Sequence, residues 1–147
     1  MLGGFSTAQG RLNVVVPMTD AVTPKRIMVV EDDLLNRLFF CDVLKDAGFA
    51  VEPVADERQA LATTKEFRPD LIVMDIHMPH ISGVDIIKSL KADPALAEIP
   101  VLAVTGYVGK GEEAQVRDAG AGGYLPKPVS IAPFVAAVNR LIEPEPA

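Results

Sequence analysis

Carboxylates follow two hydrophobic runs of this sequence, at positions where they could act together. Residues 26–30 (Arg-Ile-Met-Val-Val) lead into Glu31 and Asp32, and residues 71–74 (Leu-Ile-Val-Met) lead into Asp75. If both runs are buried parallel strands, the three acids meet at the carboxyl edge of the sheet, where open α/β sheets bind their ligands. Like charges held so close require a cation or a proton between them.

Two further hydrophobic runs end in a hydroxyl and an ammonium group. Residues 101–104 (Val-Leu-Ala-Val) precede Thr105, and residues 123–126 (Gly-Tyr-Leu-Pro) precede Lys127. Oxygen ligands mixed with water suit Mg²⁺ better than Zn²⁺, which prefers Cys and His in a tetrahedral array. A carboxylate that shares a metal with a phosphate donor can act as a nucleophile and become an acyl phosphate. Lys127 and the Thr105 hydroxyl could hold the phosphoryl oxygens.

Each of these residues also has an ordinary explanation. An Asp that ends a strand can cap the next helix, a Lys before Pro is often a loop charge, and Thr ends many strands. A motif match remains a hypothesis until its structural context is known. The combination, in this order and at four strand ends, favours a phosphoryl-transfer site.

The elements that must position these residues alternate between strand and helix five times from Pro24 onward. This alternation predicts a parallel sheet with helices on both faces. We expect strands at residues 26–30, 49–54, 71–75, 101–105 and 123–126, with helices between and after them.

Turn and cap residues predict where the helices begin and end. Gly48 should stop the first helix, Asp56 should cap the second, and Gly83 should open the third. Residues 109–119 are expected to form a short polar fourth helix. Helical spacing predicts inward-facing positions at Asn36, Phe40, Val43, Leu44 and Ala47, at Val84, Ile86, Ile87 and Leu90, and at Ile131, Phe134, Val135, Val138 and Leu141.

Length and composition restrict the class of protein. A chain of 147 residues is about one domain with a substantial core, and a net charge of -6 argues against nucleic acid as a direct partner. Cys41 is the single cysteine, so no intramolecular disulfide forms, and packing inside a helix is its expected role. Without a membrane span or a secretory signal in the sequence, we expect a cytoplasmic protein that does not bind membranes.

Both ends of the sequence are expected to be tails. Residues 1–24 are rich in Gly, Ser, Thr and Pro, which predicts a flexible N-terminal tail, and Pro residues in 143–147 prevent the last helix from continuing. We therefore expect one folded domain over residues 25–142 and no output domain. Translation from Met18 is a hypothesis that an intact mass beginning at Met1 would refute.

Four motifs together resemble the receiver domain of two-component response regulators, over about residues 25–141. The motifs are residues 29–33 (Val-Val-Glu-Asp-Asp), 73–79 (Val-Met-Asp-Ile-His-Met-Pro), 104–105 (Val-Thr) and 124–128 (Tyr-Leu-Pro-Lys-Pro). The resemblance implies a doubly wound, flavodoxin-like α/β fold, with a five-stranded parallel sheet in the order 2-1-3-4-5 and five helices.

The same resemblance implies the site residues around the metal. Asp75 is implied to be the phosphoacceptor. Glu31, Asp32 and Asp75 are implied to bind Mg²⁺, with Mn²⁺ as an alternative ion, and the backbone carbonyl of His77 is implied to complete the protein ligands.

The resemblance also implies how the signal is sensed and passed on. Thr105 and Lys127 are implied to bind the phosphoryl group, Thr105 and Tyr124 to form the switch pair, and Lys127-Pro128 to be a cis peptide. The phosphoryl donor would be phosphohistidine on a sensor histidine kinase or a histidine phosphotransferase. An effector protein would bind to the face formed by the fourth helix, fifth strand and fifth helix. Candidate surface residues there are Lys110, Glu112, Glu113, Arg117 and Asn139.

Within the family, the sequence looks most like a stand-alone regulator of the cell cycle. The similarity lies in Glu31-Asp32, in residues 81–84 (Ile-Ser-Gly-Val), in residues 105–113 and in the Pro-rich ending. Such a receiver is a signalling protein rather than an enzyme, although receiver domains assist their own phosphorylation and dephosphorylation.

Three positions depart from that pattern or affect its chemistry. Asp33 stands where the similar regulator has Asn, so it should add negative charge near the metal. His77 and Tyr107 occupy positions that influence how fast the acyl phosphate hydrolyses in the family. We expect the side chains of His77 and His80 to be exposed loop residues rather than general bases or metal ligands.

Other classes of protein remain open at this point. A Mg²⁺-dependent phosphatase could use Asp75 as its nucleophile, but haloacid-dehalogenase-like phosphatases usually carry a second Asp where this chain has His77. A flavodoxin-like FMN binder fits the fold, but an acidic first loop would repel its phosphate. A degenerate receiver that signals without phosphate, or a chemotaxis or phosphorelay shuttle regulator, would share the same residues.

Overall fold

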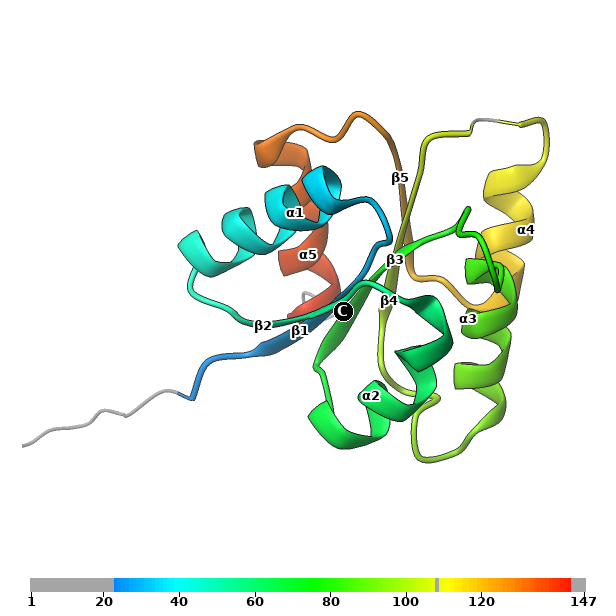
Figure 1. The fold of residues 1–147 in the computed structure, drawn as a ribbon, viewed down its shortest axis with the longest axis horizontal. Helices are drawn as coiled ribbons and strands as arrows, with labels where there is room; N and C mark the ends of the chain where they lie inside the picture. Colours follow the sequence, from blue (N-terminus) through cyan, green and yellow to red (C-terminus); the bar gives the residue numbers. More distant parts are fainter. Residues whose placement is uncertain (1–22, 108, 144–147) are drawn as a thin grey trace, which may run out of the picture.

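The computed structural model describes residues 23–107 and 109–143, so the proposed start at Met18 and most of both expected tails lie outside the described residues. The described chain forms a five-stranded parallel sheet in the order β2-β1-β3-β4-β5 (Figure 1). The predicted fold class and strand order are therefore confirmed. The strands are β1 (Arg26–Val30), β2 (Ala50–Val54), β3 (Leu71–Asp75), β4 (Val101–Thr105) and β5 (Gly123–Pro126).

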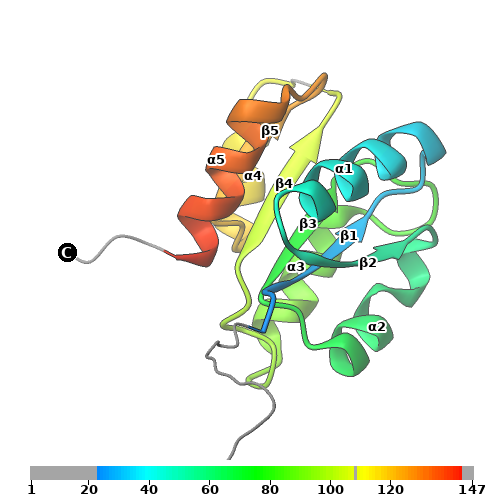
Figure 2. The same ribbon diagram turned by 90° about the vertical axis from the view of Figure 1, so that its left-hand side faces the viewer.

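Five α-helices connect and follow the strands within the described residues. Helices α1 and α5 cover one face of the sheet, and α2, α3 and α4 cover the other (Figures 1 and 2). The helices are α1 (Leu34–Asp46), α2 (Ala60–Phe67), α3 (Gly83–Ala92), α4 (Glu112–Ala119) and α5 (Ile131–Ile142), and a 3₁₀ turn, η1 (Glu57–Gln59), precedes α2.

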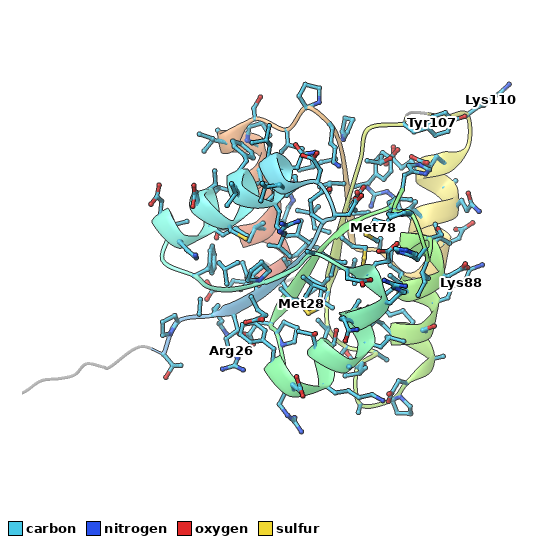
Figure 3. All side chains as sticks on the ribbon, viewed as in Figure 1. Arg26, Met28, Met78, Lys88, Tyr107 and Lys110 are labelled. Atoms are coloured by element: carbon cyan, nitrogen blue, oxygen red, sulfur yellow. The ribbon has the colours of Figure 1, made fainter. Side chains whose placement is uncertain are left out.

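The strands are hydrophobic at successive positions because both faces of the sheet are covered. Met28 and Val30 pack with α2, α3 and α4, whereas Ile27 and Val29 pack with α1 and α5. Figure 3 shows Met28 inside the molecule, between the sheet and the helices. The largest side chains that fill these two cores include Ile87 and Leu90 on one face and Phe40, Leu44 and Phe134 on the other.

Helix caps place the loops that carry the site. Asp33 is the N-cap of α1, and its Oδ2 accepts a hydrogen bond from the backbone N of Asn36 at 2.9 Å. Asp56 caps η1 rather than α2 itself, and Ser82 caps α3 immediately before Gly83. These short polar caps satisfy backbone N–H groups that the first helical turn leaves free.

The fourth helix begins later than expected, at Glu112 instead of residue 109. Gly111 has a φ of 81°, in the left-handed region, so the chain cannot already be helical at this point. This delay makes Glu112 the first helical residue and turns its side chain toward the sheet edge.

Two inward-facing predictions were wrong. Ile131 is 57% exposed, and Ala47 is also exposed, whereas Cys41 and Ala137 are buried. Ile131 is the first residue of α5, and helical side chains lean toward the N-terminus, so its side chain projects beyond the sheet. Ala47 already lies at the C-cap of α1, where the helical spacing no longer applies.

Candidate metal and phosphoryl site

The three predicted acids meet at the carboxyl edge of the sheet. Strands β1 and β3 are neighbours with Val30 opposite Met74, so the residues that follow them emerge side by side. Carboxylate oxygens of Glu31, Asp32 and Asp75 all lie within 4.8 Å of one another. Glu31 is 1% exposed and Asp75 is 3% exposed, whereas Asp32 faces solvent.

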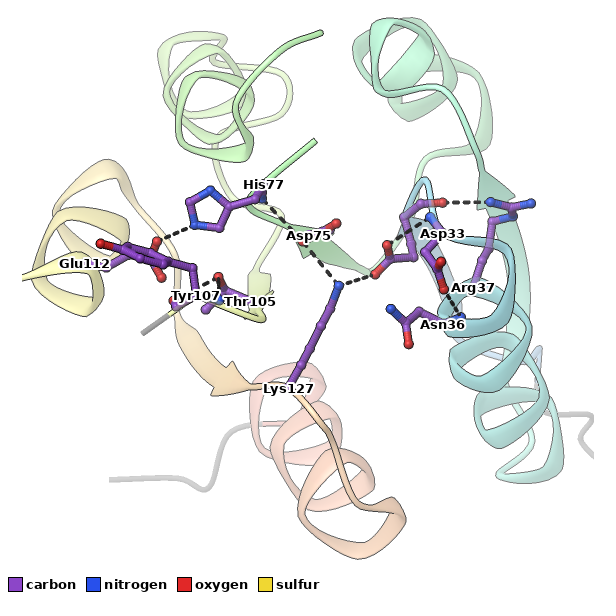
Figure 4. A network of polar contacts seen from close by, with 10 residues as sticks. Asp33, Asn36, Arg37, Asp75, His77, Thr105, Tyr107, Glu112 and Lys127 are labelled. Atoms are coloured by element: carbon purple, nitrogen blue, oxygen red, sulfur yellow. Dashed lines mark hydrogen bonds and ion pairs between the residues drawn. The ribbon is translucent and has the colours of Figure 1, made fainter. Parts of the chain in front are cut away.

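Lys127 reaches the same site from the end of β5. Its Nζ lies 2.9 Å from Glu31 Oε1 and 3.5 Å from Asp75 Oδ1 (Figure 4). Burial acts to lower the pKa of Lys127, but the carboxylates of Glu31 and Asp75 outweigh burial and raise it. The ammonium therefore stays charged beside the acids. The peptide bond between Lys127 and Pro128 is cis, as expected.

The carboxyl group of Asp75 is unusually difficult to ionise without a metal. Burial, and then the negative charge of Glu31, raise the pKa of Asp75 to about 7, although Lys127 acts in the opposite direction. A nucleophile must be ionised, and an added cation would favour the ionised form. Cation binding at this site would therefore favour the ionised form of Asp75, which is the form that a nucleophilic role would need.

The donor set fits a hard divalent cation. All three candidate ligands are carboxylates, which suit Mg²⁺ or Mn²⁺. Glu31 Oε1 is buried and accepts no hydrogen bond of good geometry among the described residues, although it forms an ion pair with Lys127. Lys127 supplies the positive charge that this buried oxygen needs, and a bound cation would add to it. Glu31, Asp32 and Asp75 could thus hold Mg²⁺.

The loop after β1 is held by contacts that the sequence did not reveal. Arg37 Nη1 donates hydrogen bonds to the backbone oxygens of Glu31 at 3.0 Å and Asp32 at 3.2 Å. The carboxylate of Asp33 caps α1, as described above, and its backbone N donates to Glu31 Oε2 at 3.1 Å. Asp33, which was expected to add negative charge near the metal, therefore also stabilises the start of α1 and the loop before it.

Thr105 and Tyr107 lie beside one another at the end of β4. Thr105 is fully buried, and its hydroxyl exchanges hydrogen bonds of 3.2 Å with the backbone N and O of Tyr107. The Tyr107 side chain is 60% exposed, and its ring meets the His77 ring edge-on at 5.4 Å between centroids. Figure 3 shows Tyr107 and Lys110 at the same end of the molecule.

Each histidine has a buried glutamate as its partner, which the sequence did not predict. His77 Nε2 lies 2.5 Å from Glu112 Oε2, and Tyr124 donates from its hydroxyl to Glu112 Oε1 at 2.9 Å. Both histidines are still exposed, as expected, but Glu112 is only 7% exposed. The expectation that Glu112 is a surface contact was therefore wrong.

Glu57 is the buried glutamate that contacts His80. It accepts hydrogen bonds from the backbone N of His80 at 2.5 Å and of Ile81 at 3.1 Å, and it lies 3.4 Å from His80 Nδ1. Burial raises the pKa of Glu57, but these hydrogen bonds outweigh burial and lower it. Because the loop itself satisfies this buried carboxylate, we assign Glu57 a structural role in holding the segment before α3.

The fold and the site together define a class of protein. Residues 27–139 match the model of the response regulator receiver domain, and the chain belongs to that family of two-component signalling proteins. Among the described residues, no helix has the length and apolar character to cross a membrane.

Individual response regulators are also similar to this chain in sequence and in structure. The chain is 40% identical to the polar-differentiation response regulator DivK of Brucella anthropi, over 81% of this chain and 97% of that protein. It is also similar to the solved structure of chemotaxis protein CheY4 of Vibrio cholerae, with a TM-score of 0.75, 28% identity and coverage of 81% and 99%. A response regulator of Desulfuromonas acetoxidans gives a TM-score of 0.74 at 33% identity, with coverage of 81% and 97%.

Proposed function

We propose that this protein is a single-domain response regulator that accepts a phosphoryl group on Asp75 in a Mg²⁺-dependent reaction. The observation that supports this most strongly is the convergence on Asp75 of two further acids from the loop after β1 and one ammonium from the end of β5. Carboxylate oxygens of Glu31, Asp32 and Asp75 lie within 4.8 Å of one another, and Lys127 Nζ is 3.5 Å from Asp75 Oδ1.

The proposed reaction transfers a phosphoryl group from a histidine nitrogen of the donor to a carboxylate oxygen of Asp75. A carboxylate oxygen of Asp75 attacks the phosphorus of a phosphohistidine, and the P–N bond breaks with its electron pair remaining on the imidazole nitrogen. The products are an acyl phosphate on Asp75 and a free imidazole on the donor. Lys127 holds the phosphoryl oxygens as a point charge, and the Thr105 hydroxyl donates a hydrogen bond to them.

Glu31, Asp32 and Asp75 are the proposed side-chain ligands of Mg²⁺, with the backbone carbonyl of His77 as the fourth protein ligand. When bound, Mg²⁺ would supply positive charge that neutralises the transferring phosphoryl group. Lys127 keeps Glu31 oriented through their 2.9 Å ion pair. Arg37 fixes the loop that carries Glu31 and Asp32 through its backbone hydrogen bonds.

The phosphorylated protein would signal by binding another protein through the face of α4, β5 and α5. The donor would be a sensor histidine kinase or a histidine phosphotransferase. Charge added at Asp75 can bias two arrangements of a nearby surface. The similarity to DivK supports a role in cell-cycle or developmental control. On this face, Lys110, Glu113, Arg117 and Asn139 remain exposed candidates for contact.

Intact mass after incubation with acetyl phosphate and Mg²⁺ tests the proposal directly. We expect a gain of one phosphoryl group in the wild type and none in Asp75→Asn or in samples with excess EDTA. Asp85→Asn, which changes an exposed acid on α3, serves as the matched control and should still gain the group. A wild type that gains no phosphoryl group, while a known receiver does so in parallel, would contradict the proposal.

A further inference from the structure

Glu112 joins two parts of the molecule that are far apart in sequence. Its Oε2 lies 2.5 Å from His77 Nε2, in the loop after β3, and its Oε1 accepts a 2.9 Å hydrogen bond from the hydroxyl of Tyr124 on β5. Figure 4 shows the first of these contacts reaching from α4 across to His77. The buried carboxylate of Glu112 therefore contacts the loop after β3 with one oxygen and β5 with the other.

The loop residue in this contact also touches the phosphoacceptor. The backbone N of His77 donates a hydrogen bond to Asp75 Oδ1 at 3.3 Å, while the ring of the same residue contacts Glu112 (Figure 4). Three consecutive contacts thus lead from Asp75 through His77 and Glu112 to Tyr124. A new group on Asp75 Oδ1 would have to displace or share the first of these contacts.

Thr105 and Tyr124 are joined to different partners in this structure. The Thr105 hydroxyl is engaged with the backbone of Tyr107, and the Tyr124 hydroxyl is engaged with Glu112. Burial and then the Glu112 contact raise the pKa of Tyr124 to about 12, which agrees with a phenol held as a donor to a carboxylate. The orientation of Tyr124 therefore depends on Glu112 in this state.

A buried carboxylate that loses one donor is costly, because its oxygen has no water to replace the lost hydrogen bond. Glu112 is only 7% exposed, so movement of the His77 ring would favour movement of Glu112 and release of Tyr124. We propose that Glu112 is a positioning residue that links the loop after Asp75 to Tyr124, so that a change at Asp75 reaches β5 through His77 and Glu112. The trigger of this link in the cell would be phosphorylation of Asp75, so the proposal rests on the proposed function.

The intensity of the fluorescence emission of Tyr124 gives a direct test of the link. The chain has two tyrosines and no tryptophan, so Tyr107→Phe leaves Tyr124 as the only strong emitter. A carboxylate that accepts a hydrogen bond from a phenol quenches its emission. In this background and without phosphate, we expect Glu112→Ala to raise the emission of Tyr124. Glu112→Gln, which keeps the shape but not the charge, should raise it less.

Glu113→Ala is the matched control, because Glu113 is the next residue of the same helix but is exposed and pairs with Arg117. It should leave the emission unchanged. Equal emission in Glu112→Ala and Glu113→Ala would overturn the proposal. If Glu112→Ala does not fold, the Glu112→Gln variant decides the question by the same comparison.

The link itself is tested by the response to phosphorylation with acetyl phosphate and Mg²⁺. His77→Ala and Glu112→Ala should each reduce the change in Tyr124 emission about twofold or more. The double variant should lose no more than either single variant, because both interrupt one path. Fully additive losses would overturn the link.

Intact mass of the same samples separates this proposal from the proposed function. If the wild type gains no phosphoryl group, the proposed function fails, and unphosphorylated samples then decide the link alone. In that case His77→Ala must change the emission of Tyr124 when Glu112 is present and must not change it in the Glu112→Ala background. Any other result would overturn the link.

Discussion

At the scale of single residues, Asp75 is a buried acid whose negative charge its surroundings disfavour. Its carboxyl group is 3% exposed and lies among other acids, and its pKa is raised to about 7 by burial and by Glu31. An ionised Asp75 is therefore costly in the folded state unless a cation is present. The proposed chemistry and the stability of the metal-free protein depend on the same group.

The contribution of Asp75 to the stability of the metal-free protein should decrease as pH rises from about 4 to about 7. The folded protein keeps the proton on Asp75 up to about pH 7, whereas the unfolded chain releases it near its ordinary pKa of 3.8. Because the folded state binds more protons in this window, its free energy of unfolding falls as pH rises through it. Asp75→Asn should remove this contribution and stabilise the protein at pH 8 by up to about 4 kcal/mol.

Urea unfolding in EDTA at pH 5 and pH 8 measures the effect. The difference between wild type and Asp75→Asn isolates the contribution of Asp75 from that of other titrating groups. Asp85→Asn should follow the wild type at both pH values, since Asp85 is exposed on α3. Identical pH dependence in the wild type and Asp75→Asn would show that Asp75 ionises normally.

Asp32 offers a second prediction, because it is the one exposed member of the acidic cluster. Removing it should cost little stability without metal but should weaken Mg²⁺ binding. At a concentration about 100 times its dissociation constant, Mg²⁺ should stabilise the wild type by about 2.7 kcal/mol. Thermal unfolding with and without Mg²⁺ should show this gain, and Asp32→Ala should lose most of it. Retention of the full gain would remove Asp32 from the proposed ligands.

At the scale of elements, the approach of α3 to the end of β3 determines where Asp75 lies. A Cβ at Gly83 would lie 2.5 Å from the backbone oxygen of Asp75 and 2.8 Å from the Cα of Ile76. Such contacts are too short for any side chain, so only glycine allows α3 to begin here. The backbone N of Gly83 also donates to the oxygen of Ile76 at 2.9 Å, which ties the two elements together.

Gly83→Ala should therefore destabilise the protein by about 1–3 kcal/mol, because backbone must move to make room. It should also slow phosphorylation of Asp75, since the end of β3 would shift. Gly106→Ala is the comparison, because its added Cβ would meet only the Lys127 side chain at an ordinary 3.8 Å. Urea unfolding of both variants measures the difference, and equal stability would contradict the close packing of α3 on β3.

At the scale of the whole molecule, one sheet serves two hydrophobic cores. Alternate residues of each buried strand enter opposite cores, so the helices of both faces are connected through the same backbone. Neither core is complete without the sheet. We therefore expect one cooperative unfolding transition for the whole domain.

Phe134→Ala tests the size and the cooperativity of this packing. Phe134 on α5 is fully buried against Phe40, with ring centroids 5.0 Å apart, so its removal should cost about 3–5 kcal/mol. Ile131→Ala in the same helix should change stability by less than about 0.5 kcal/mol, because Ile131 is exposed. Circular dichroism during urea unfolding should show a single, earlier transition for Phe134→Ala. A separate early transition of α5 would contradict one cooperative unit.

The amino-acid sequence by itself determined the alternating elements, the strand order implied by the family motifs, and the acids and lysine at the strand ends. These features are local: a buried parallel strand is a continuous hydrophobic run, and its end is marked by the first polar residue. Asp75 and Lys127 could be placed at the sheet edge for that reason. The helix faces were predicted well where spacing was regular, as for Phe40 and Leu44, and failed at the helix ends, as for Ile131.

Only the tertiary structure decided the partners of polar groups that are distant in sequence. Glu112 and Glu113 are adjacent acids of the same type, yet one is buried between His77 and Tyr124 and the other is exposed. Their difference depends on the left-handed turn at Gly111, which sets the first residue of α4 and so the direction of each side chain. Contact between side chains is a property of three-dimensional packing, and no local pattern of residue types specifies it.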